Sequence, residues 1–160
     1  MANEGDEAVA PAAKRVPPLR PSFVVPSLLI GLYAMAPGIW LGGLHVKRNA
    51  EIVDHVIPGL VVLASILVAV SWGPARRGAS TVLFGASLVI GLAGLWMAAT
   101  HVGLLLQGIR GQAPGPSVAY HCSTAFLTLV LGVTWVGRHW SAVASPAGEQ
   151  TPAGEQEGGG

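Results

Sequence analysis

Histidine is the residue type in this chain whose positions suggest chemistry most strongly. The 160 residues include five histidines, and four of them fall at or near the ends of apolar segments. These four are His45, His55, His101 and His121. Because neutral imidazole is the commonest protein ligand for transition metals, histidines at one depth of a helical bundle predict a metal or haem site.

Two of these histidines form the predicted cofactor-binding pair. A b-type haem needs two rings on opposing helices at equal depth, and His55 and His121 fit that requirement, with His101 as a competitor or third ligand. A transition metal ion is the other candidate cofactor, and a quinone-facing proton relay would use the same rings. Three further side chains nearby are candidate metal ligands: His45, Asp54 and Cys122. Asp54 is also a candidate for orienting a ring.

A structural interpretation of the same histidines stays open beside this one. His45, His55 and His121 lie within about one helical turn of a segment end, and Trp40 lies at the same level, as in an aromatic belt. Rings in such a place can bond water, lipid headgroups or backbone carbonyls without binding a cofactor. The chain also has no His-x-x-x-His or Cys-x-x-Cys pattern.

Long apolar segments are the elements that must position these side chains. They cover residues 22–44, 52–72, 80–106 and 118–136. A hydrocarbon core of about 30 Å needs about 20 helical residues, and lipid leaves the backbone no other partners, so each segment is predicted to be a membrane-spanning helix. The short connectors contain proline, glycine or charge, which favours antiparallel neighbours. The sequence therefore predicts an all-α integral membrane protein, a four-helix antiparallel bundle.

Composition and charge support a membrane protein and set its orientation. Hydrophobic residues make up 51% of the chain and charged residues 11%, too few charges for the surface of a soluble domain. The net charge of +1 provides no basic surface for nucleic acid. Six Lys and Arg flank the spans on one side and three on the other, which predicts the plasma (inner) membrane with both termini cytoplasmic. The tails, 1–21 and 141–160, are predicted to be disordered, leaving a membrane domain at 22–140.

An internal repeat relates the first and third segments. The string SLLIGL at 27–32 matches SLVIGL at 87–92, an offset of 60 residues. With a longer third connector, Asp54 and His55 then align with Tyr120 and His121. The pattern predicts two copies of a helical hairpin related by a pseudo-two-fold axis along the membrane normal.

The first predicted hairpin resembles a known family. The stretch from LIGL at 29–32 through APGIWLG at 36–42, followed by NA at 49–50 and VIPGLVV at 56–62, is similar to the SPW-repeat family of bacterial integral membrane proteins. Members carry Ser-Pro-Trp near the end of the first helix of each hairpin, where this chain has Ala36-Pro37-Gly38. The resemblance implies paired spans and no particular biochemical activity.

The sequence is compatible with two functions. The first is a non-enzymatic accessory or structural subunit of a membrane complex, which packs against other membrane subunits or against itself through small-residue helix faces. The second is a redox membrane anchor that binds haem or a transition metal near the outer face through His55, His101 and His121. No hydrolase or phosphate-binding motif appears in the sequence, and no charged residue lies near the middle of a predicted span to favour a transporter.

Overall fold

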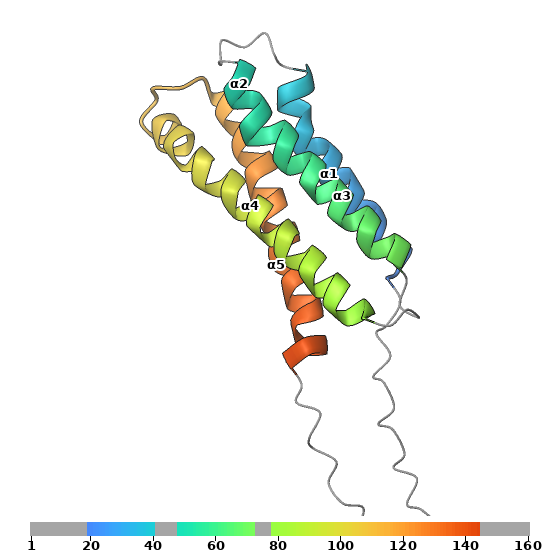
Figure 1. The fold of residues 1–160 in the computed structure, drawn as a ribbon. Helices are drawn as coiled ribbons and strands as arrows, with labels where there is room; N and C mark the ends of the chain where they lie inside the picture. Colours follow the sequence, from blue (N-terminus) through green and yellow to red (C-terminus); the bar gives the residue numbers. More distant parts are fainter. Residues whose placement is uncertain (1–18, 41–47, 73–77, 145–160) are drawn as a thin grey trace, which may run out of the picture.

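The computed structural model describes residues 19–40, 48–72 and 78–144. Their helical elements, in chain order, are α1 (Pro21–Trp40), α2 (Arg48–Glu51), η1 (Ile52–Val56), α3 (Ile57–Trp72), α4 (Ala79–Ile109) and α5 (Gly115–Ala144). The elements α2, η1 and α3 follow one another without a break and form one continuous rod (Figure 1). Most of both predicted tails lies outside the described residues.

The helices form a four-membered antiparallel bundle. The first helix, α1, packs against α3 and α5, and α4 packs against the same two helices (Figure 1). The pairs α1 and α4, and α3 and α5, are therefore diagonal across the bundle. This arrangement confirms the all-α class predicted from the sequence. It places side chains from four helical rods against one central axis: α1, the continuous α2–η1–α3 rod, α4 and α5.

Three helical stretches among the described residues are long and apolar enough to cross a membrane. They are Asn49–Trp72, Ala79–Ile109 and Gly115–Trp140. The described apolar part of α1, Pro21–Pro37, is shorter. The prediction of membrane helices is supported for these three segments, and a fourth crossing by α1 stays a prediction.

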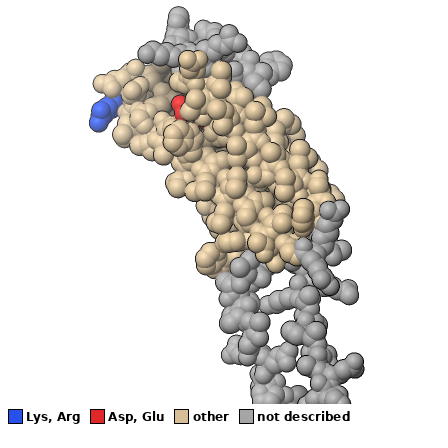
Figure 2. Space-filling view, in the orientation of Figure 1, with Lys and Arg blue, Asp and Glu red and all other residues tan. Residues whose placement is uncertain are grey.

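The outward faces of the bundle are apolar. Leu92 on α4 and Phe126 and Val133 on α5 are all more than half exposed. Figure 2 shows that charged atoms are sparse on the described surface of this face, and those in view lie near one end. Such a surface is consistent with a membrane protein, because large exposed apolar areas are unfavourable in water.

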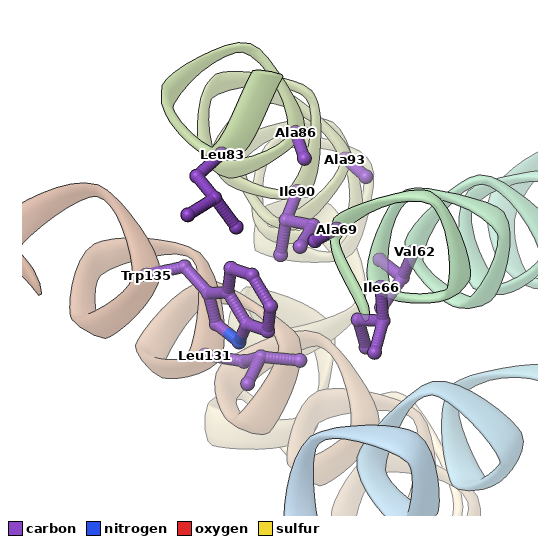
Figure 3. Packing of buried hydrophobic residues seen from close by; sticks show 9 residues of the cluster. All are labelled: Val62, Ile66, Ala69, Leu83, Ala86, Ile90, Ala93, Leu131 and Trp135. Atoms are coloured by element: carbon purple, nitrogen blue, oxygen red, sulfur yellow. The ribbon is translucent and has the colours of Figure 1, made fainter. Parts of the chain in front are cut away.

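The inward faces carry stripes of buried residues at helical spacing. On α5 one such stripe is buried throughout, and it consists of His121, Thr124, Thr128, Leu131 and Trp135. Trp135 is completely buried and packs among aliphatic side chains of α3 and α4, including Ile66 and Ile90 (Figure 3). The indole N–H donates to the Ser27 hydroxyl oxygen of α1 at 3.0 Å, which ties α5 to α1.

Glycines allow α4 and α5 to approach closely. A Cβ atom on Gly94 would lie 2.6 Å from the Thr128 carbonyl oxygen, and one on Gly132 would lie 2.7 Å from the Gly91 Cα. Small residues at such a crossing let two backbones pack directly, which is the usual way that helices associate in lipid.

The helices are longer than the predicted spans. The predicted connector at 45–51 is helical from Arg48, and α5 continues past 136 to Ala144, although the sequence predicts a disordered tail from 141. The segment from 137 to 144 contains no proline, so helical hydrogen bonding continues through it. The third rod, α4, ends just before a glycine: Gly111 has φ 68°, and the Gln112 N–H donates to the Gln107 carbonyl oxygen at 2.8 Å.

The element η1 is a wide π-helical turn, and Pro58 explains it. Proline lacks an N–H to bond the carbonyl of Asp54, and its ring crowds that carbonyl in a regular α-helix. The wider turn relieves this conflict, and the Ile57 N–H donates to the carbonyl of Ile52, five residues earlier. Turns of this kind occur frequently at functional sites, and this one carries the buried His55.

Candidate metal centre

Three histidine side chains meet inside the bundle near one end. His55 comes from η1, His101 from α4 and His121 from α5, so each ring belongs to a different rod. Their exposed fractions are 1%, 7% and 5%. Imidazole rings buried this deeply need hydrogen-bonding or metal partners, because an unpaired polar group in an apolar interior is unfavourable.

One nitrogen atom of His55 lies at the centre of the cluster. His55 Nε2 is 2.8 Å from His121 Nδ1 and 3.0 Å from His101 Nε2. One ring nitrogen from each histidine lies within 4.8 Å of the other two. The three side chains therefore present their nitrogens to one small volume on the bundle axis.

Backbone carbonyls determine which nitrogens carry the ring hydrogens. His55 Nδ1 is 3.2 Å from the Ala34 carbonyl oxygen of α1, and His101 Nδ1 is 2.7 Å from the Met97 carbonyl oxygen of α4. A carbonyl oxygen only accepts, so both Nδ1 atoms donate and both Nε2 atoms present lone pairs. The Nε2 atoms of His55 and His101 thus face each other as two acceptors.

With these tautomers, the three neutral rings have too few ring hydrogens to form a hydrogen bond in both short nitrogen–nitrogen contacts. If His121 donates its Nδ1–H to His55 Nε2, then His101 Nε2 still faces an atom that cannot donate to it. An extra proton would satisfy the lone pair but would put a charge in the apolar interior. A metal ion satisfies all three nitrogens together. Metal-bound histidines commonly donate their second nitrogen to a carbonyl or carboxylate, as these rings are placed to do.

A buried carboxylate lies on the far side of His121. Glu51, the last residue of α2, is 4% exposed, and its Oε1 is 3.8 Å from His121 Nε2. Its Oε2 is buried and has no hydrogen-bond partner among the described residues. The sequence reasoning missed Glu51. The available signal was its position four residues before His55, which puts both side chains on one helix face.

The geometry suits a single transition metal ion. Zinc binds histidine nitrogen at about 2.0–2.1 Å, so two nitrogens of a tetrahedral site lie about 3.3 Å apart. The two short nitrogen contacts, 2.8 and 3.0 Å, need to widen by a few tenths of an ångström to meet this value. The third pair, between His101 and His121, lies within 4.8 Å and would have to adjust to the same value. Three nitrogen ligands also favour zinc, copper or nickel over magnesium or calcium, which prefer oxygen.

The same contact speaks against a haem between His55 and His121. Two axial nitrogens across one iron lie about 4 Å apart, with the macrocycle filling the plane between them. In this protein the two nitrogens are 2.8 Å apart and leave no room for such a plane.

The other sequence candidates are not part of this cluster. His45 lies outside the described residues. Asp54 and Cys122 are both partly exposed, and neither belongs to the group of close ligand atoms found among the described side chains. Asp54 is next to His55 in sequence, but adjacent residues on a helix point about 100° apart and do not share a face.

The fifth histidine belongs to a separate buried polar cluster at the opposite end of the bundle. His139 is 4% exposed, and its Nδ1 lies 2.9 Å from the Ser87 hydroxyl oxygen and 3.0 Å from the Trp135 carbonyl oxygen. Its partners are thus a hydroxyl and a backbone carbonyl, which distinguishes it from the three-histidine cluster and makes it a useful control.

Comparisons with protein-family models, curated proteins and solved structures give no match for this chain. The resemblance to the SPW-repeat family therefore stays a prediction.

Proposed function

We propose that this chain is a membrane protein that binds one transition metal ion, with Zn²⁺ as the first candidate, through His55, His101 and His121. The observation that carries the proposal is the convergence of three ring nitrogens on one point while the other nitrogens of His55 and His101 bond backbone carbonyls. This leaves lone pairs where a cation would sit. Three protein ligands also leave a fourth position for water or another ligand.

We place the proposed site near the outer face of the plasma (inner) membrane. The Lys and Arg count favours cytoplasmic termini, and in that topology the junctions from the first to the second rod and from the third to the fourth face outward. The cluster lies at that end of the bundle. Metal would then reach the site from the outer side without crossing the membrane.

The proposed role is that of a non-enzymatic subunit in which the metal holds the four rods together near one face. All four rods supply a group to the site: the Ala34 carbonyl from α1, then His55, His101 and His121. Apolar outward faces fit lipid, further membrane subunits or self-association as partners. Loss of the metal would loosen the packing of the rods at the outer end of the bundle. The outward apolar faces would then offer a different surface to their partners.

A duplicated hairpin would explain why two of the ligands meet. In the proposed repeat His55 corresponds to His121, and the diagonal placement of α3 and α5 is what a two-fold axis through the bundle requires. Ser27 and Ser87 also correspond, and each hydroxyl donates to the carbonyl oxygen four residues earlier. These equivalences support duplication, with His101 as an addition to one copy.

Equilibrium metal binding tests the proposal. Detergent-purified protein is stripped with a chelator and titrated with Zn²⁺ against a chromophoric competitor. We expect one ion per chain, with binding weakened at least about tenfold by His55→Ala, His101→Ala or His121→Ala. His139→Ala is the matched control and should bind as the wild type does. Wild-type protein that holds no Zn²⁺ above a detergent blank would overturn the proposal, and a Soret band lost in the His55 and His121 variants would favour the haem alternative.

A further inference from the structure

We propose that Glu51 is the positioning residue of the metal centre, and that its carboxylate also balances part of the charge of the bound ion. This inference rests on the proposed function. Glu51 would accept a hydrogen bond from His121 Nε2–H, so that His121 Nδ1 keeps its lone pair directed at the point where the Nε2 atoms of His55 and His101 meet.

The positioning role follows from a comparison of the three rings. The nitrogens of His55 and His101 that face away from the cluster are each fixed by a carbonyl, from Ala34 and Met97. The corresponding nitrogen of His121 faces Glu51 Oε1 at 3.8 Å, so the two atoms would have to approach by at least about 0.6 Å to form a hydrogen bond. Each ring thus has an acceptor behind it. A histidine oriented by a carboxylate on one side and bound to metal on the other is a recurring arrangement in proteins.

Glu51 lies behind the ligands and does not join them. Its Oε1 faces Nε2 of His121, whereas the short contact to His55 is made by Nδ1. The group of close ligand atoms found among the described residues contains the three histidines without Glu51. The carboxylate therefore acts through His121, as a positioning group.

The charge-balancing role follows from the second carboxylate oxygen. Glu51 Oε2 is buried and has no hydrogen-bond partner among the described residues. A buried charge with an unpaired atom is unfavourable unless an opposite charge lies nearby. A divalent ion held by three neutral imidazoles carries two positive charges in a low-dielectric interior, and the carboxylate behind His121 would compensate one of them.

The experiment separates the two roles with Co²⁺, whose visible spectrum reports the number and geometry of its ligands. Glu51→Gln keeps an oxygen that can accept from His121 but removes the negative charge. Glu51→Leu removes both. His139→Gln, which changes a buried polar side chain at the opposite end of the bundle, is the control. All variants are compared as detergent-purified full-length protein.

The two Glu51 variants should give different results. Glu51→Gln should weaken Co²⁺ and Zn²⁺ binding about tenfold and leave the Co²⁺ spectrum unchanged. Glu51→Leu should weaken binding about 100-fold and shift the spectrum, because His121 is no longer held in one tautomer. The ¹⁵N shifts of the His121 ring should then show both tautomers, which a purely structural effect on folding would not produce. His139→Gln should bind both ions as the wild type does.

The outcomes distinguish this inference from the proposed function. If the wild type binds metal and both Glu51 variants bind it with unchanged affinity and spectrum, the role of Glu51 is wrong and the metal site stands. If Glu51→Leu fails to fold, unchanged binding by Glu51→Gln alone refutes the charge-balancing role. If the wild type binds neither Co²⁺ nor Zn²⁺, the proposed function fails and this inference fails with it.

Discussion

Replacing His101 with leucine should leave the metal-free protein as stable as the wild type or more stable, and should make the protein less stable than the wild type when metal is present. In the metal-free protein, His101 Nε2 faces His55 Nε2 at 3.0 Å as one acceptor against another. Leaving a buried acceptor unpaired costs about 1–3 kcal/mol, and His101→Leu removes that penalty and adds apolar contact. The metal-free variant should therefore unfold at the same temperature as the wild type or a higher one.

Metal should reverse this order. A ligand at about 100 times its dissociation constant stabilises the folded state by about 2.7 kcal/mol. For a protein of this size, 1 kcal/mol shifts the midpoint of unfolding by about 2–4 °C, so saturating Zn²⁺ should raise the wild-type midpoint by about 5–10 °C. His101→Leu has lost one of three ligands and should show little or no shift.

Thermal unfolding followed by tryptophan fluorescence measures these shifts in chelator-treated protein with and without Zn²⁺. His139→Leu is the matched control, because His139 is equally buried but bonds Ser87 and the Trp135 carbonyl. The unfolding midpoint of His139→Leu should differ from that of the wild type by the same amount with and without Zn²⁺. The increase in midpoint that Zn²⁺ causes should therefore equal that of the wild type. The reasoning is refuted if His101→Leu keeps the wild-type shift, or if His139→Leu loses it.

Three other predictions follow from the structure. Zn²⁺ affinity should fall as the pH is lowered from 7 to 5 in competition titrations, because protons and the ion compete for the same imidazole nitrogens; a constant affinity would contradict histidine ligation. Gly94→Ala should destabilise by about 1–3 kcal/mol in denaturant titrations, because its Cβ would lie 2.6 Å from the Thr128 carbonyl oxygen, while Gly85→Ala, whose Cβ meets open space, should be neutral or stabilising. Trp135→Phe and Ser27→Ala should show a coupling energy of about 1 kcal/mol in a double-mutant cycle, and additive effects would mean that their 3.0 Å hydrogen bond adds nothing.

Much of the site could be predicted from the sequence because helices that cross a membrane have a fixed rise. His55, His101 and His121 lie within three to five residues of their predicted segment ends, which places them at similar depth, and the structure brings these three rings together. The buried stripe from His121 to Trp135 is likewise a direct result of helical periodicity.

The rest of the site depends on details that periodicity does not carry. Asp54 is the sequence candidate for orienting a ring, and the buried carboxylate that faces His121 belongs to Glu51, one helical turn before His55. The wide turn that Pro58 imposes at Ile52–Val56 changes the angle between successive side chains. Helical periodicity read from the sequence is that of a regular α-helix and does not include this change. The distance between ring nitrogens, which decides between one ion and a haem, arises only from the packing of three rods.

X-ray absorption at the zinc edge tests the central claim most directly. Full-length protein loaded with one equivalent of Zn²⁺ should show three nitrogen ligands at about 2.0 Å with the outer-atom scattering of imidazole rings, and His55→Ala should lose that signal. A spectrum with oxygen ligands alone, or one that His55→Ala leaves unchanged, would contradict a metal centre built from these three histidines.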